Sequence, residues 1–141
     1  MLNMKYPISF LENPNAEMKT LVKGLNEEAK EKKGISPSKF FGFFIKDEKE
    51  NIIGGITGYI YSNSLSINLL WVDKKLREKG YGSNLLQKAE EYAKENGCSF
   101  VTLETLNWQA PEFYKKNGYK EEFRQEGYAK NSTKLHFRKD F

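Results

Sequence analysis

The chain has 141 residues, of which 38% are hydrophobic and 30% are charged, and it contains one cysteine, Cys98. This composition is typical of a soluble globular protein, so we expect a single domain over residues 1–141 without an intrachain disulfide. The formal net charge of +4 comes from interspersed acids and bases, which argues against a one-sided nucleic-acid-binding stripe. No apolar run is long enough for a membrane span and residues 1–7 lack a signal-peptide pattern, so we expect a cytoplasmic protein.

The N-terminal part predicts a strand, a helix and a loop. Residues 5–10 are compatible with a first strand, and a turn follows at residues 13–15. Residues 16–32 predict an amphipathic helix that ends at Gly34. The apolar positions of this helix recur at steps of three and four residues, at Met18, Val22, Leu25 and Ala29.

Three strands are predicted next, at residues 40–45, 52–61 and 65–73, and short turns join them into an antiparallel meander. In the third strand Leu65, Ile67 and Leu69 share one face, whereas Leu70 and Val72 place apolar groups on the other. Either this strand is buried on both faces or a bulge resets its alternation.

The remaining segments alternate between helix and strand. A helix over 83–96 and a strand over 100–105 follow the meander, and this strand-helix-strand order predicts a right-handed parallel crossover. A short helix over 109–117 and strands over 119–126 and 133–140 complete the chain. The order β-α-β-β-β-α-β-α-β-β indicates an α+β fold with a mixed sheet.

The turn from Arg77 to Gly82, with sequence Arg-Glu-Lys-Gly-Tyr-Gly, joins strand 65–73 to helix 83–96. Its two glycines lack a Cβ, so an anion can approach the backbone closely. The backbone amides of residues 79–83 lie at the positive end of the helix, where they can bind phosphate or pyrophosphate. Ligand sites of such units lie beyond the carboxyl ends of the strands, which is where this turn lies.

This Arg-x-x-Gly-x-Gly turn resembles the acyl-coenzyme A signature of the GNAT N-acetyltransferase superfamily. A second segment, residues 107–119, is similar to a later helix of that family and the strand after it. The resemblance covers roughly residues 50–141. It implies a mixed, mostly antiparallel sheet flanked by helices, in which the parallel strand-helix-strand unit forms the acetyl-CoA cleft.

The resemblance also implies a function and a set of cofactor contacts. It implies an acetyl-CoA-dependent N-acetyltransferase in which a primary amine, expected to belong to a small molecule, attacks directly in a ternary complex. A strand amide near Trp71 or Val72 would polarise the thioester carbonyl. Arg77 would either contact phosphate or brace the loop, and Asn107 would either bond the pantetheine arm or cap a helix. The implied cofactor-binding residues are Leu70, Trp71, Val72, Arg77, Lys79, Gly80, Tyr81, Gly82, Ser83, Asn107 and Tyr114.

Two residues are candidates for proton transfer. By resemblance, Tyr114 would protonate the departing thiolate, the alternative being a core aromatic. Glu104 faces away from Val101 and could act as a general base through a water, or it could be a structural strand acid. Many relatives carry an acid where this chain has Asn68, so a water chain or a backbone carbonyl is also a candidate base.

Other parts of the sequence predict no chemistry. His136 alternates with Leu135 and Phe137, so we expect it to face solvent without a catalytic role. Cys98 is expected to be small and buried. No metal-ligand spacing is present, so no metal is expected.

The partners expected are acetyl-CoA and a small amine, with neither nucleic acid nor membrane, in a monomer or homodimer. Residues 16–38 and 124–134 would supply the acceptor contacts. The alternative functions are a non-catalytic acyl-CoA-binding sensor, a protein or peptide N-acetyltransferase, and a small nucleic-acid-binding module.

Overall fold

The computed structural model describes residues 5–141, and the chain divides into two compact units, one up to Pro37 and one over residues 38–141. The expectation of a single domain over residues 1–141 stays a prediction. The expectation about a signal peptide falls partly on residues 1–4, which lie outside the described residues. Within residues 5–141, no helix is long and apolar enough to cross a membrane.

The first unit contains one helix, α1, over Asn15–Lys33. Gly34 ends it in a left-handed conformation with φ 65°, and its N–H donates to the carbonyl of Lys30 at 2.9 Å. The predicted helix is therefore confirmed. The strand predicted over residues 5–10 is wrong, because that segment is irregular. Its Pro7 lacks an N–H to donate to a neighbouring strand.

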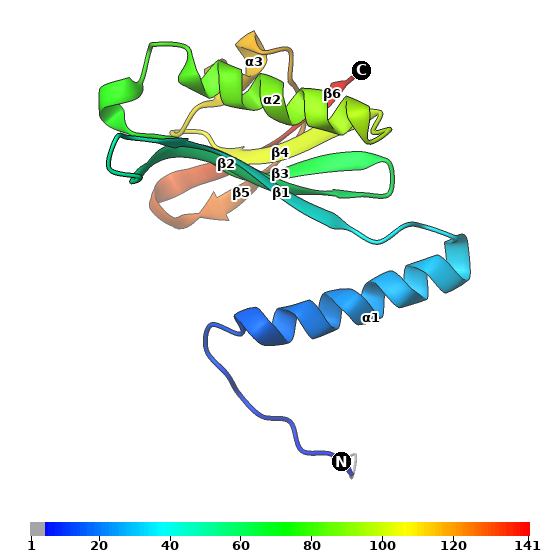
Figure 1. The fold of residues 1–141 in the computed structure, drawn as a ribbon. Coiled ribbons are helices and arrows are strands. Elements are labelled where there is room, and N and C mark those ends of the chain that lie inside the picture. The colour runs from blue at the N-terminus through cyan, green and yellow to red at the C-terminus, as the bar shows by residue number, and fades with distance from the viewer. Residues whose placement is uncertain (1–4) are drawn as a thin grey trace. The chain divides into compact units, whose positions relative to one another are not determined.

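The second unit is a six-stranded sheet with the order β1-β2-β3-β4-β6-β5. The helix α2 lies over one face of the sheet, and α3 lies toward the same side (Figure 1). Each element predicted between residues 40 and 140 is present within two residues of its expected ends. The bounds are β1 Lys39–Lys46, β2 Ile52–Tyr61, β3 Ser64–Val72, η1 Lys74–Leu76, α2 Tyr81–Glu95, β4 Phe100–Leu106, α3 Pro111–Lys116, β5 Lys120–Tyr128, η2 Ala129–Asn131 and β6 Ser132–Asp140.

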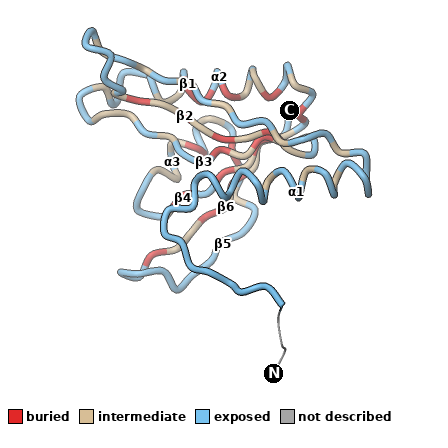
Figure 2. Tube along the Cα trace, turned by 60° about the horizontal axis from the view of Figure 1, so that its bottom comes forward, coloured by how far each residue is buried: buried red, intermediate tan, exposed pale blue. Residues whose placement is uncertain are grey.

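The core of this unit lies between α2 and the sheet. Buried residues line the middle strands and the side of α2 that faces them (Figure 2). Helix α2 contributes small and branched apolar residues at helical spacing, which is the stripe expected from the sequence. Cys98 is also buried, as predicted. The buried residues of α2 are Leu85, Leu86, Ala89 and Ala93.

A β-bulge interrupts β3 at Asn68. Thr57 of β2 pairs with Leu69, whereas the next residue, Gly58, pairs with Ile67, so Asn68 has no partner. Of the two interpretations of this strand, the bulge is confirmed. Leu69 was expected to share a face with Ile67, but the bulge turns it outward, where it is 68% exposed. A Cβ on Gly58 would lie 2.1 Å from the carbonyl oxygen of Ser66, so this close approach requires glycine.

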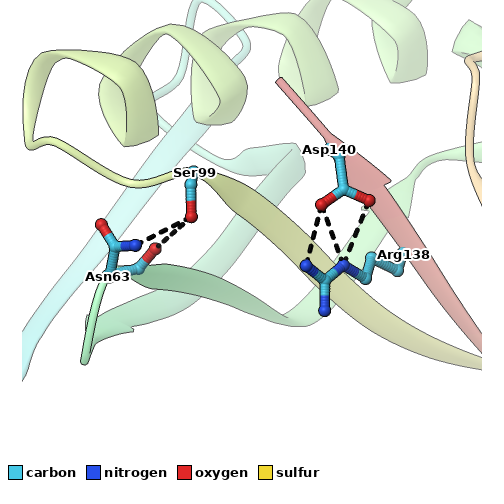
Figure 3. Close-up of polar contacts among 4 residues, drawn as sticks. All are labelled: Asn63, Ser99, Arg138 and Asp140. Carbon is cyan, nitrogen blue, oxygen red and sulfur yellow. Dashed lines mark hydrogen bonds and ion pairs between the residues drawn. The ribbon is translucent and has the colours of Figure 1, made fainter.

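The parallel strands β3 and β4 pair at one end only. Their pairing spans Ser64–Ser66 and Phe100–Thr102 and does not continue, although both strands do. The paired end is tied by Asn63, whose side-chain amide donates to the Ser99 hydroxyl at 2.8 Å (Figure 3). The Ser99 N–H donates to the carbonyl of Asn63 at 3.0 Å. The two strands are thus held together at one end and free to separate beyond the bulge.

Candidate active site

A cleft of about 860 Å³ lies where β3 and β4 have ceased to pair. One wall is the end of β3 with the turn into α2, and the other is the segment from Trp108 to Lys116. Eight of the eleven predicted cofactor residues line this cleft. They are Leu70, Trp71, Val72, Arg77, Gly80, Gly82, Ser83 and Tyr114.

The turn before α2 presents unpaired backbone amides. Glu78 and Gly80 are left-handed, with φ 62° and 88°, which reverses the chain tightly after η1. No side chain caps the helix, and its first bond runs from the N–H of Asn84 to the carbonyl of Gly80 at 3.0 Å. The amides of residues 81–83 precede that bond, so they can bind a phosphate.

Arg77 braces this turn. Its Nε donates to the carbonyl oxygen of Val72 at 3.0 Å, which joins the turn to the end of β3. Of the two roles expected for Arg77, this bond supports bracing, although the side chain also lines the cleft.

Gly82 keeps the cleft open beside α3. A Cβ at this position would meet the ring of Phe113 at 3.3 Å, and a branched side chain would extend further into the cleft. The need for glycine here is therefore steric. Gly80 supplies the left-handed backbone instead.

Tyr114 lies at the junction of the cleft and the core. It is 8% exposed, and its ring packs against Tyr119 and Phe137 with centroids 6.1 Å away in each case. Burial raises the pKa of its phenol, so the hydroxyl stays protonated at neutral pH. Tyr114 is thus both a core aromatic and a lining residue of the cleft, and the two roles considered from the sequence are compatible.

Three predicted cofactor residues do not line the cleft, namely Lys79, Tyr81 and Asn107. Of the two roles considered for Asn107, the helix cap is wrong, whereas the bond to the pantetheine arm stays a prediction. The cap residue of α3 is Ala110, and the Asn107 side-chain oxygen instead accepts from the N–H of Thr133 at 3.0 Å. Asn107 therefore ties the loop after β4 to the start of β6, a contact between segments far apart in sequence.

Glu104 does not line the cleft, but lies in a second hollow of about 440 Å³. Glu104 alternates with the buried residues Val101 and Leu103 of β4, so this hollow lies on the sheet face opposite α2. We call it the rear groove, and it is lined by Tyr59, Ser66, Ile67, Asn68, Thr102, Leu103, Glu104, Glu122, Phe123, His136 and Phe137. The proposed role of Glu104 as a base stays a prediction.

His136 is a residue whose setting sequence reasoning missed. We expected it to face solvent, but its side chain is only 17% exposed because the ring of Phe123 stacks on it at 3.9 Å. Its Nδ1 lies 3.4 Å from Oε1 of Glu104. The register of β4 and β6 places these two residues opposite each other. This pairing is what indicates the setting of His136, and it is visible only in the folded structure.

Comparison with known proteins agrees with this geometry. Residues 10–119 match the acetyltransferase (GNAT) family. The chain belongs to this family. An acetyltransferase from Bacillus cereus has the same fold, with a TM-score of 0.76 and 35% identity over 97% of this chain and 98% of that one. The α+β fold with a mixed, mostly antiparallel sheet is thereby confirmed.

Two relatives bear on the ligands of the family. The blasticidin-S acetyltransferase of Streptomyces morookaense is 36% identical over 60% of this chain. This match spans 62% of that relative, so the chain covers less than two thirds of its length. A Bacillus anthracis structure, named provisionally for streptothricin acetylation, contains acetyl coenzyme A and matches with a TM-score of 0.64 and 27% identity. That match covers 72% of this chain and 62% of the other.

Proposed function

We propose that this protein transfers an acetyl group from acetyl-CoA to a primary amine of a small molecule, by direct attack in a ternary complex. The observation that carries the proposal is that Gly82 and Ser83, in the uncapped first turn of α2, and Tyr114 line one cleft. Membership of the family and the acetyl coenzyme A bound to one relative support the donor. Two of the relatives are named for blasticidin-S and streptothricin rather than for a protein or peptide, which favours a small acceptor.

Each part of the cleft has a role in this proposal. The amides of residues 81–83 bind the pyrophosphate, assisted by the Ser83 hydroxyl, and Arg77 holds their turn in place. The end of β3 beyond the bulge, at Leu70, Trp71 and Val72, binds the pantetheine arm. Proximity supplies most of the rate enhancement, because both reactants are held in one orientation.

Tyr114 is the acid in this scheme. The amine lone pair attacks the thioester carbonyl, and the tetrahedral intermediate collapses with loss of the coenzyme A thiolate. The protonated phenol gives its proton to the sulfur as the carbon–sulfur bond breaks. Because burial raises the pKa of this phenol, it is a weak acid, so we expect its contribution to be moderate.

The deciding experiment is acetyl-CoA turnover against a panel of primary amines, measured by thiol release. Gly82→Val is the matched variant, because its side chain would meet Phe113 in the cleft without a left-handed backbone constraint. We expect turnover in the natural protein and loss of both turnover and acetyl-CoA affinity in the variant. Acetyl-CoA binding without turnover of any amine would instead favour a non-catalytic acyl-CoA sensor, and absence of binding would remove the cofactor assignment.

A further inference from the structure

The rear groove contains an imidazole and a carboxylate arranged as a pair. Glu104 of β4 and His136 of β6 are direct partners in the antiparallel register, on the face opposite α2. Nδ1 of His136 lies 3.4 Å from Oε1 of Glu104, and the stacked ring of Phe123 fixes the plane of the imidazole at 13° to its own. The other carboxylate oxygen, Oε2, lies 3.4 Å from Nζ of Lys134. Both partners of the pair are thus held in place by neighbours.

In the tautomer of His136 that is protonated at Nε2, the lone pair of Nδ1 is directed at Glu104. This tautomer donates from Nε2 to Oε1 of Gln125, which lies 2.9 Å away. In the neutral ring Nδ1 is then an acceptor, and it faces a second acceptor, the carboxylate of Glu104. A group with at least two N–H donors and a positive charge would satisfy both. A primary ammonium has these properties.

The groove opens where the two parallel strands part. The last β3–β4 pair is Ser66 with Thr102, and Asn68 and Glu104 are each two residues further along their strands. Leu70, again two residues further along β3, already lines the cleft that also contains Tyr114. An amine bound at Glu104 would therefore lie beside the gap between the strands that leads toward the cleft.

We propose that the acceptor's primary ammonium binds between Nδ1 of His136 and Oε1 of Glu104, and that His136 is the base that takes its proton. This inference rests on the proposed function. The ammonium gives one proton to Nδ1, and the neutral amine then attacks the thioester carbon. As the carbon–sulfur bond breaks, Tyr114 gives its proton to the thiolate sulfur, and the second proton lost by the nitrogen restores the Tyr114 phenol. His136 later releases its proton to solvent, so that one proton is produced per acetyl group transferred.

The charged surroundings support this division of roles. Besides Glu104, the groups around His136 are Lys134 and Arg138 on its own strand, Glu122 on β5 and the Tyr59 phenol on β2. Arg138 is engaged with Asp140 at 2.8 Å (Figure 3). Lys134 holds one oxygen of Glu104 and leaves the other facing the imidazole. Glu104 is accordingly a positioning residue that binds the ammonium and stabilises the imidazolium after proton transfer.

The chain has one histidine, so a protein labelled with ¹⁵N-histidine gives the signals of His136 alone. The probes are butylammonium and its quaternary analogue butyltrimethylammonium, which has no N–H. We expect a saturable shift of the Nδ1 signal with butylammonium only, and its loss in Glu104→Gln. No shift with butylammonium, or equal shifts with both cations, would overturn the ammonium site.

The kinetic test uses His136→Phe, which keeps an aromatic ring against Phe123 but has no base. With an amine that the natural protein acetylates, we expect kcat/KM to fall by about 10²–10⁴-fold and its acidic limb to disappear. Acetyl-CoA affinity, measured by calorimetry, should be unchanged, and so should the rate of the control Arg138→Gln. For Glu104→Gln we expect the amine KM to rise more than kcat falls.

The outcomes separate the two proposals. A rate and pH profile of His136→Phe close to those of the natural protein would overturn the base role while leaving the acetyltransferase proposal intact. A natural protein that turns over no amine would overturn the proposed function, and with it the base role, whatever the labelled imidazole reports.

Discussion

Nε of Arg77 donates a hydrogen bond of 3.0 Å to the carbonyl oxygen of Val72, across the turn that separates β3 from α2. The same carbonyl belongs to the last residue of the strand that lines the cleft. The position of the uncapped amides is therefore coupled to the position of the strand end, and a single side chain provides the coupling.

Substitutions of Arg77 can distinguish bracing of the turn from direct binding of phosphate by the arginine charge. If Arg77 acts through its bond to Val72, Arg77→Lys and Arg77→Met should weaken acetyl-CoA binding alike, by a few-fold up to about tenfold, since one hydrogen bond contributes about 0.5–1.5 kcal/mol. Calorimetry at two salt concentrations measures this. If the lysine variant instead keeps natural affinity while the methionine variant loses it with a reduced salt dependence, the charge of Arg77 binds phosphate directly.

The bulge in β3 gives a prediction about stability. Gly58→Ala would place a Cβ 2.1 Å from the carbonyl oxygen of Ser66, and backbone cannot move aside as a flexible side chain can. We expect the free energy of unfolding to fall by about 1–3 kcal/mol or more, as in overpacked cores. Urea denaturation measures the change. The control Gly24→Ala, where a Cβ meets nothing within 4 Å, should not lower stability. A urea midpoint of Gly58→Ala equal to that of the natural protein would mean that the backbone at the bulge can shift to accommodate the Cβ.

Local periodicity was sufficient to predict the six strands and the helices α2 and α3 from residue 39 onward, but not the short helices η1 and η2. Alternation in β1 and β2 and the three- and four-residue steps of α2 are properties of neighbouring residues, so they appear in one sequence. The strand predicted over residues 5–10 failed because a strand needs a partner, which a local pattern does not reveal.

The candidate site was predictable only where it depends on local geometry. The residues of the turn before α2 are contiguous in sequence, and its glycines and basic residues predict an anion site. The roles of Asn107 and His136 depend instead on β6, through Thr133 in one case and Glu104 in the other. The outward turn of Leu69 follows from a single unpaired residue, Asn68, which apolar periodicity could not locate.

A buried phenol makes stability sensitive to alkaline pH. Tyr119 is 2% exposed and donates to Oε2 of Glu90 at 2.9 Å, while Lys139 donates to Oε1 of the same carboxylate at 2.9 Å. Burial, followed by the charge of Glu90, raises the pKa of this phenol well above its ordinary value. Tyr119 is therefore protonated in the folded state at a pH where the unfolded chain has begun to ionise.

The sign of the pH effect follows from that shift. A group with a raised pKa in the folded state contributes stability below its unfolded pKa of about 10, and this contribution declines at higher pH. Tyr119→Phe should thus be less stable than the natural protein at pH 8, and the difference should shrink at pH 10.5 and above. Urea midpoints at the two pH values test this. A difference that stays constant would show that the phenol does not ionise on unfolding.

The last prediction concerns the acid. Tyr114→Phe removes one hydroxyl and keeps the ring that packs on Tyr119 and Phe137, so the fold and the cleft should persist. We expect kcat to fall toward the low end of the range of about 10²–10⁴-fold for a lost general acid. We expect the low end of this range for two reasons. The raised pKa of the phenol makes it a weak acid, and a thiolate leaves readily without help.

The measurement pairs the single-turnover rate of thiol release with acetyl-CoA affinity on the same preparation. An unchanged rate would mean that the thiolate leaves unassisted or is protonated by water, and that Tyr114 serves as a wall of the cleft. A parallel fall in rate and affinity would mean that the hydroxyl acts in ground-state binding. Only a fall in rate at constant affinity is consistent with proton donation, because the hydroxyl must then matter more in the transition state than in the bound ground state.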